Sequence, residues 1–435
     1  MPEAAGSPPG DASARRAVEA VWRIESARIV GALTRYTGDF ALAEDVAQEA
    51  LAEALTSWAA QGVPTSPVGW LLATARRRAI DGFRRKSALD ERYSALAGQL
   101  TDGEFYSGAA VVGSDQSHDL PWDPDRVGDD VLALMFTACH PVLSPEARVA
   151  LTLRVVGGLS SDEIARAFLV PTTTVQARIT RAKKTIAAAR VPFELPSAQE
   201  RSARLGGVLS VLYVIFTEGS TATAGDRLLR TDLAYEAVRL TRMLAALLPG
   251  EPEVYGLLAL FELTGARFPA RTGPDGEAVL LEDQDRRLWD RSAIRRGLAV
   301  LGRAPAAGRG LGPYGLQAAI AACHATAPTV QETDWEQIVL LYEALGRLAP
   351  SPVVELNRAV AVAMARGPRQ ALSMVDELVA TGRLSGSHLL PGVRGELLAR
   401  LGRTTEARAE LELAARLCRN NRERSVLLRK AAALS

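Results

Sequence analysis

The chain of 435 residues is long enough for two to four domains, and its 48% apolar and 23% charged residues are typical of a soluble, folded protein. Only 5% of the residues are aromatic, while alanine, leucine and arginine recur, which favours an all-α fold over an all-β sandwich. The 51 basic and 50 acidic residues leave a net charge of +1, which excludes a strong overall attraction to nucleic acid but permits charged segments.

Residues 1–14 are rich in proline, glycine and serine and are predicted to form a disordered tail. No apolar stretch follows the charges in this tail, so a signal peptide is not expected. From residue 15 to 89 apolar residues recur at helical spacing, and Pro64 and Pro67 divide the pattern into two helical blocks. We therefore expect a first helical domain over residues 15–89.

Within this domain, residues 38–58 (GDFALAEDVAQEALAEALTSW) predict an acidic, amphipathic helix. Its leucine, valine and alanine residues can face a core, which leaves acidic and amide side chains pointing outward. An acidic helix suits a basic protein surface better than it suits DNA. The outward residues singled out for protein binding are Asp39, Glu44, Asp45, Gln48 and Glu49.

The next helix is predicted in residues 69–86 (GWLLATARRRAIDGFRRK), where six basic residues accompany one aspartate. A basic face that also carries an aromatic ring can hold phosphates and stack on an unpaired base. Basic helix faces are usually only solvated, so this pattern is weak by itself. The DNA-binding candidates here are Trp70, Arg76, Arg77, Arg78, Arg84, Arg85 and Lys86.

A segment of different composition follows, with ten acidic residues and only two arginines between Asp90 and Asp130. Glycine, serine and proline are scattered through it. We therefore predict a long acidic linker over residues 90–129 and a second helical domain over 130–191.

The second domain contains a predicted helix-turn-helix in residues 157–186. Ser160 and Glu163 form a capping-box pattern, Pro171 breaks the helix, and Thr172 is a suitable N-cap for a second, longer helix. The second helix of such a motif enters the DNA major groove, where hydroxyl, amide and guanidinium groups read base edges and phosphates. Its candidates are Thr172, Thr173, Thr174, Gln176, Arg178, Arg181, Lys183 and Lys184.

Pro192 and Pro196 mark a boundary, after which residues 197–435 are predicted to be helical almost throughout. A weak repeat of helix, glycine turn and helix places Gly367 and Gly402 35 residues apart, close to the tetratricopeptide period. Stacked pairs of this kind usually leave a groove for a partner. A helical bundle without a ligand is the alternative.

Few features suggest a metal, a cofactor or enzymatic catalysis. Cys139 and Cys323 each precede a histidine, but no further ligand is close in sequence, so buried thiols are expected. The acidic cluster in residues 280–290 is expected to pair with local arginines. The cysteines form no CxxC pair and no apolar run makes a good membrane span, so we expect a cytoplasmic protein without cofactor.

The order of these motifs resembles the extracytoplasmic-function group of bacterial RNA polymerase sigma factors over roughly residues 15–190. The resemblance implies that AEDVAQEAL docks on the polymerase clamp as part of region two and that the basic helix opens and reads the minus-ten element. It also implies that the helix-turn-helix is region four, which reads the minus-thirty-five element and contacts the polymerase flap. The family often has asparagine where this sequence has Arg77, and the linker is longer than expected.

The whole layout is similar to the subgroup with a C-terminal tetratricopeptide-like extension, in which residues 197–435 would be regulatory or required for activity. The resemblance therefore implies a promoter-specificity subunit with core polymerase and promoter DNA as partners, a protein regulator at the C-terminal domain, and no membrane partner. The alternative is a transcription activator that couples a helix-turn-helix to a helical-repeat sensor. That alternative leaves the acidic helix and the basic helix of residues 69–86 without a role.

Overall fold

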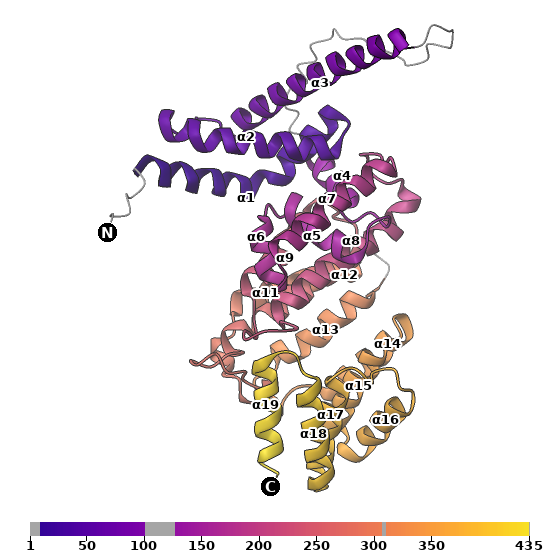
Figure 1. The fold of residues 1–435 in the computed structure, drawn as a ribbon. Helices are drawn as coiled ribbons and strands as arrows, with labels where there is room; N and C mark the ends of the chain where they lie inside the picture. The colour runs from indigo at the N-terminus through magenta and orange to yellow at the C-terminus, as the bar shows by residue number, and fades with distance from the viewer. Residues whose placement is uncertain (1–8, 101–126, 307–309, 435) are drawn as a thin grey trace. The chain divides into compact units, whose positions relative to one another are not determined.

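The computed structural model describes residues 9–100, 127–306 and 310–434, and Figure 1 shows a chain built almost entirely of helices. Within the described residues no β-strand occurs and only two isolated bridges are found, which confirms the predicted all-α class. No helix among them is long and apolar enough to cross a membrane. The chain divides into two compact units, which are described separately below.

The first unit contains the described residues up to Ile164 together with residues 172–208. Its first three helices pack on one another around buried apolar residues such as Leu33, and the rings of Trp58 and Trp70 meet edge to face at 5.6 Å. The break between the second and third helices falls at the predicted proline pair. The helices of this unit are α1 (Pro9–Thr37), α2 (Phe40–Gln61), α3 (Pro67–Leu100), α4 (Val127–Ala138), α5 (Pro145–Val155), α7 (Thr172–Ala188) and the first half of α6 (Ser161–Phe168).

Two predicted boundaries in this unit differ from the structure. Helix α1 begins at Pro9, so residues 9–14 are helical instead of belonging to the disordered tail, and residues 1–8 lie outside the described residues. Helix α3 runs to Leu100 and α4 starts at Val127, so the predicted linker is helical at both ends. The rest of that linker, residues 101–126, lies outside the described residues.

The second unit contains residues 209–435 and the short segment 165–171. The division therefore falls inside a continuous helix, α8 (Ala198–Ser220), and not at the predicted boundary of Pro192 and Pro196. The remaining helices are α9 (Thr231–Leu247), α10 (Pro252–Gly265), η1 (Phe268–Ala270), η2 (Leu281–Asp283), η3 (Arg286–Leu288), α11 (Arg291–Leu301), α12 (Arg303–Ala306), α13 (Pro313–Thr326), α14 (Trp335–Leu348), α15 (Pro352–Ala365), α16 (Pro368–Ala380), α17 (Leu389–Arg400), α18 (Thr404–Leu417) and α19 (Asn421–Ala432).

Helix α10 lies at the centre of the N-terminal half of this unit, because nearly all of its residues are buried. The ring of Phe261 stacks on that of Phe216 with centroids 4.0 Å apart. A β-carbon on Gly256 would lie 2.5 Å from the backbone nitrogen of Gly315, so glycine permits the close approach of α10 and α13.

The C-terminal half of the unit consists of helix pairs that contact their neighbours in chain order, from α14 to α19. Gly367 and Gly402 both have positive φ, +97° and +76°, at the turns between paired helices. Glycine takes this conformation without the steric cost that other residues have. The predicted helix–glycine turn–helix repeat is therefore confirmed.

Candidate nucleic-acid interface

The predicted helix-turn-helix is formed by α6 and α7, and local sequence explains its geometry. The amide of Ser160 donates to Glu163 Oε2 at 2.8 Å and the amide of Glu163 donates to Ser160 Oγ at 3.2 Å, so the capping box is confirmed. Leu169 takes a left-handed conformation (φ 51°) in the turn. Thr172, predicted as an N-cap, is instead the first residue of α7, and its hydroxyl donates to Asp162 Oδ1 at 2.7 Å.

Helix α7 presents half of its eight predicted DNA-binding residues fully to solvent. Val175, Ile179 and two further apolar residues form its buried face. The opposite face carries hydroxyl, amide and basic side chains of the kind that reads a major groove. Thr173, Gln176, Arg181 and Lys184 are exposed, whereas Thr172, Thr174, Arg178 and Lys183 are half-buried.

Lys183 differs from the other candidates because it is bound to the acidic helix. Its side chain, 14% exposed, donates to Asp45 Oδ1 at 2.9 Å and pairs with Glu44. Burial opposes the charge of Lys183, but the carboxylates of Glu44 and Asp45 outweigh it and raise the pKa of the lysine. Residues predicted to bind two different partners therefore contact each other in this conformation.

Glu44 was expected to lie outward, and this expectation is wrong for the conformation described. Its side chain is only 5% exposed, because α7 packs beside α2 and Arg154 of α5 reaches it, donating from Nε to Glu44 Oε1 at 3.1 Å. Of the other predicted protein-binding residues, Asp45 and Glu49 are exposed and Gln48 is half-buried. Asp39 is exposed and caps α2 through the amides of its second and third residues.

Further contacts join α1 to the domain of α4–α7. Arg35 pairs with Asp130 at 3.0 Å and Arg23 pairs with Glu163 at 3.3 Å. Gly158, at φ +69°, lies so close to α1 that a β-carbon there would be 2.8 Å from Ser26 Oγ and 3.0 Å from the carbonyl oxygen of Trp22. The two predicted domains therefore pack tightly within one compact unit.

Gly158→Ala is expected to destabilise this packing, whereas Gly38→Ala is a matched control with a nearly equal φ of +66° and nothing within 4 Å of its β-carbon. Both variants lose about 1–2 kcal/mol from the left-handed backbone. Gly158→Ala loses about 1–3 kcal/mol more through the clash with α1. Thermal unfolding of both variants measures the difference, and equal stabilities would contradict the close contact.

The basic helix α3 holds its predicted residues in different ways. Arg78 pairs with Glu53 at 2.8 Å, and this hydrogen bond raises the pKa of the guanidinium. Arg77 donates to Thr74 Oγ1 at 3.1 Å, and Arg76 lies over the ring of Tyr36 at 5.5 Å from its centroid.

The end of α3 adds exposed apolar side chains to this basic surface. Trp70 is half-buried and Arg84 is exposed, while the side chains of Arg85 and Lys86 lie outside the described part of the chain. Ile80 and Phe83, which the sequence analysis did not single out for DNA binding, are 37% and 41% exposed. An exposed ring beside arginines is suited to stacking on an unpaired base.

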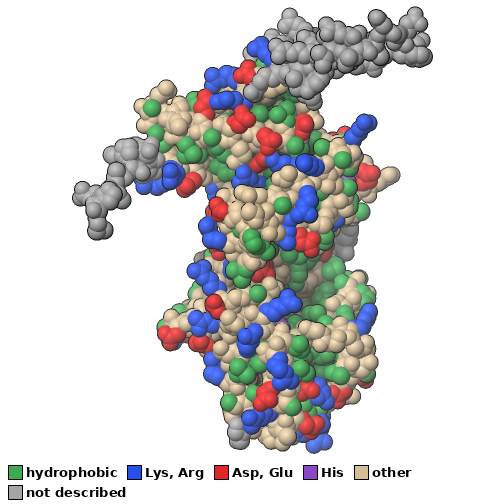
Figure 2. All heavy atoms as spheres, viewed as in Figure 1, with side chains coloured by type: hydrophobic (Ala, Val, Ile, Leu, Met, Phe, Trp, Pro, Cys, Tyr) green, Lys and Arg blue, Asp and Glu red, His purple; other side chains and the backbone are tan. Residues whose placement is uncertain are grey.

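On the face shown in Figure 2, basic and acidic side chains are interspersed among the described residues.

The turn of the helix-turn-helix, in residues 165–171, belongs to the C-terminal unit. The sequence analysis did not predict this assignment. Arg230, whose side chain is 9% exposed, pairs with Glu218 and donates to the carbonyl oxygens of Ala167 and, at 2.9 Å, Ala224. Ala167 lies in the last turn of α6, within the segment 165–171 that groups with the C-terminal unit. Glu218, near the end of α8, and Arg230, just before α9, flank a loop rich in glycine and threonine, and nothing in the sequence marks them as a pair.

The smaller predictions have mixed outcomes. Cys139 is a buried thiol bonded to Thr152, as expected, and burial raises its pKa to about 11. Asp285 pairs with Arg287 at 2.8 Å, as expected for the acidic cluster, whereas Asp290 instead caps α11.

Three family descriptions match consecutive parts of the chain. Residues 23–88 match Sigma-70 region 2, and residues 133–186 match Sigma-70, region 4. Residues 204–305 match a family of unknown function (DUF6596). The first two segments contain the acidic helix, most of the basic helix and the helix-turn-helix.

Several proteins are similar in sequence. An uncharacterized protein of Rhizobium meliloti is 45% identical over 406 residues, 91% of this chain and 90% of that protein. A probable ECF RNA polymerase sigma factor of Mycobacterium tuberculosis, SigI, is 30% identical over 186 residues, 42% of this chain and 59% of SigI. The RNA polymerase sigma-H factor of Pseudomonas aeruginosa is 29% identical over 172 residues, 38% of this chain and 82% of that protein. No solved structure is significantly similar.

Proposed function

Because the chain belongs to the extracytoplasmic-function group of bacterial sigma-70 factors, which act in transcription initiation, we propose that it binds core RNA polymerase and directs it to promoters. The resemblance seen in the sequence is confirmed for regions two and four. The observation that supports promoter reading most directly is α7, which follows the well-capped helix α6 and keeps Gln176, Arg181 and Lys184 exposed. Asp45 and Glu49 on α2 are the proposed contacts to the polymerase clamp, and α3 is proposed to read the minus-ten element.

The contact of Lys183 with Glu44 and Asp45 supports a second step in this proposal. A lysine held by two carboxylates cannot contact DNA phosphates, and a buried glutamate cannot contact polymerase. The conformation described is therefore proposed to be a closed form, and regions two and four separate when the polymerase binds.

We also propose that the C-terminal helical region modulates activity. The bond from Arg230 to Ala167 supports this, because it connects the C-terminal unit to the end of α6. Whatever partner or signal changes the packing around Arg230 would then change how the turn holds α7.

Run-off transcription with purified core polymerase tests the main proposal. Initiation is expected to depend on this protein and to fall at least about tenfold in the Arg178→Ala/Arg181→Ala variant, since one good side chain–base contact contributes about 1–3 kcal/mol. Arg295→Ala, an exposed arginine of α11, is the matched control and is expected to keep full activity. DNA binding without polymerase, combined with no protein-dependent initiation, would favour a transcription activator instead.

A further inference from the structure

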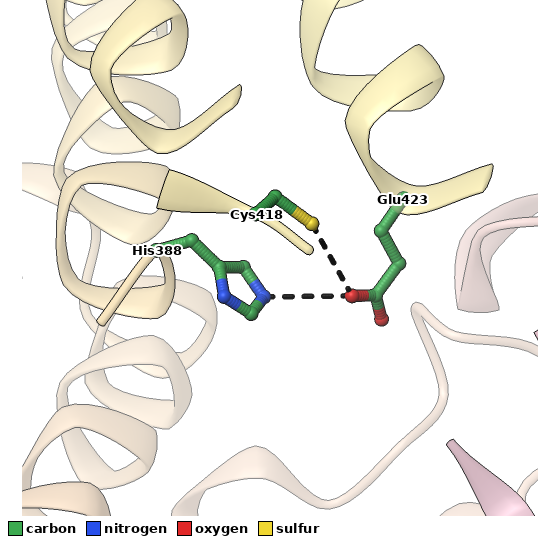
Figure 3. A group of neighbouring side chains, drawn as sticks. All are labelled: His388, Cys418 and Glu423. Carbon is green, nitrogen blue, oxygen red and sulfur yellow. Dashed lines mark hydrogen bonds and ion pairs between the residues drawn. The ribbon is translucent and has the colours of Figure 1, made fainter. Parts of the chain in front are cut away.

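Three metal-ligating side chains of different chemistry meet at the junction of α17, α18 and α19 (Figure 3). His388 directly precedes α17, Cys418 directly follows α18, and Glu423 lies in the first turn of α19. Cys418 and Glu423 lie 30 and 35 positions after His388 in the sequence, so no local motif identified the group. Among the described residues, this is the one group of three possible metal ligands whose ligand atoms lie close together.

Two of the three distances between the ligand atoms are close to those around one metal ion. His388 Nε2 lies 3.4 Å from Glu423 Oε2, Cys418 Sγ lies 3.7 Å from the same oxygen, and all three ligand atoms lie within 4.8 Å of one another. A tetrahedral zinc ion with bonds of about 2.0–2.3 Å holds its ligand atoms about 3.3–3.8 Å apart. Small side-chain rotations would therefore complete the geometry.

The backbone around the cluster is held in place before any ion binds. Asn420, which is 1% exposed, donates through Nδ2 to the carbonyl oxygens of Ala222 and Arg227, both at 2.9 Å. Its Oδ1 accepts the amide of Glu423 at 3.3 Å. Asn420 thus fixes the loop that carries Cys418 and the helix start that carries Glu423, as the support of a metal site requires.

The cluster is also accessible. Cys418 is buried, but the side chains of His388 and Glu423 are 30% and 28% exposed. Both line a cavity of about 370 Å³ in the same unit. An ion could enter from this cavity, and a fourth coordination position would face it.

We propose that His388, Cys418 and Glu423 bind a divalent transition-metal ion of the zinc type. Thiolate, imidazole and carboxylate are the three side-chain ligands that zinc accepts, and three protein ligands leave one position open. The ion links α17, α18 and α19, so its binding stabilises the end of the helical repeat. This site does not depend on the proposed promoter recognition.

Cobalt(II) is the probe that tests the site in the full-length, reduced protein. Titration is expected to give one ion per chain with a thiolate-to-cobalt absorption band that zinc removes by competition. Cys418→Ser is expected to abolish the band and to weaken zinc binding by at least about 100-fold. Cys323→Ser, at a half-buried cysteine outside the cluster, is the control and is expected to leave the band unchanged.

The variants His388→Gln and Glu423→Gln test the site independently of any folding defect in Cys418→Ser, since both side chains are partly exposed. Each is expected to weaken binding while far-UV circular dichroism stays native. Zinc is also expected to raise the Tm of the native protein and not that of Cys418→Ser. A missing cobalt–thiolate band, or one that persists in Cys418→Ser, would overturn the proposal.

Discussion

Lys183→Glu is expected to separate α2 from α7 and to tighten binding to core polymerase. The substitution places a third carboxylate beside Glu44 and Asp45, where the structure has a lysine that pairs with both. Loss of one partner of a buried ion pair costs about 3–5 kcal/mol, and like charges add repulsion. Arg154 still neutralises part of Glu44, so we expect a net loss of about 3 kcal/mol from the closed contact. That corresponds to an increase of about 100-fold in the open form.

Two measurements check this result. Spin labels on Thr56→Cys of α2 and Thr180→Cys of α7, both exposed, report the distance between the helices in a Cys323→Ser background, where the remaining cysteines are buried. The distance distribution is expected to shift to longer values in Lys183→Glu. Affinity for core polymerase is expected to rise about tenfold or more, because Glu44 and Asp45 become free.

Lys184→Glu is the matched control, since it makes the same charge change one residue along α7 at an exposed position. It is expected to keep the closed distance and the native affinity for polymerase. If Lys183→Glu and Lys184→Glu gave the same distance distribution, the contact with Glu44 would not hold the closed form.

Features set by neighbouring residues were predictable from the sequence. The capping box of Ser160 and Glu163, the break at Pro67 and the glycine turn at Gly367 depend on interactions within a few residues, and the structure contains all three. Helix positions and the order of the two sigma regions follow from such signals. This is why the class of fold and the family could be inferred before the structure.

Features that depend on distant partners were not predictable. An amphipathic pattern identifies the polar face of α2, but it does not show that Arg154 and Lys183 cover part of that face and bury Glu44. The linker prediction was likewise too long, because acidic composition alone does not prevent a helix from continuing through residues 90–100. Cys418 and Glu423 lie five positions apart, a spacing that does not by itself specify a metal site, and only the fold brings His388 to them.

Arg230→Met is expected to lower the stability of the C-terminal unit by about 3–5 kcal/mol, because it leaves a buried glutamate without its partner. The side chains of Arg230 and Glu218 are 9% and 11% exposed. Hydrogen exchange in peptides of α8 and α9, together with the Tm, measures the loss within the full chain. Arg242→Met is the matched control, because its partner Glu262 stays paired with Arg296 at 3.0 Å.

Adding Glu218→Gln to Arg230→Met separates folding from regulation. The double variant has no unpaired buried charge, so more than half of the lost stability is expected to return. The bond from Arg230 to the carbonyl oxygen of Ala167 stays absent in both variants. If the C-terminal unit modulates activity through the end of α6, run-off transcription remains altered in the double variant after stability has recovered. Transcription that recovers in step with the Tm would instead show that Arg230 serves only the fold of its own unit.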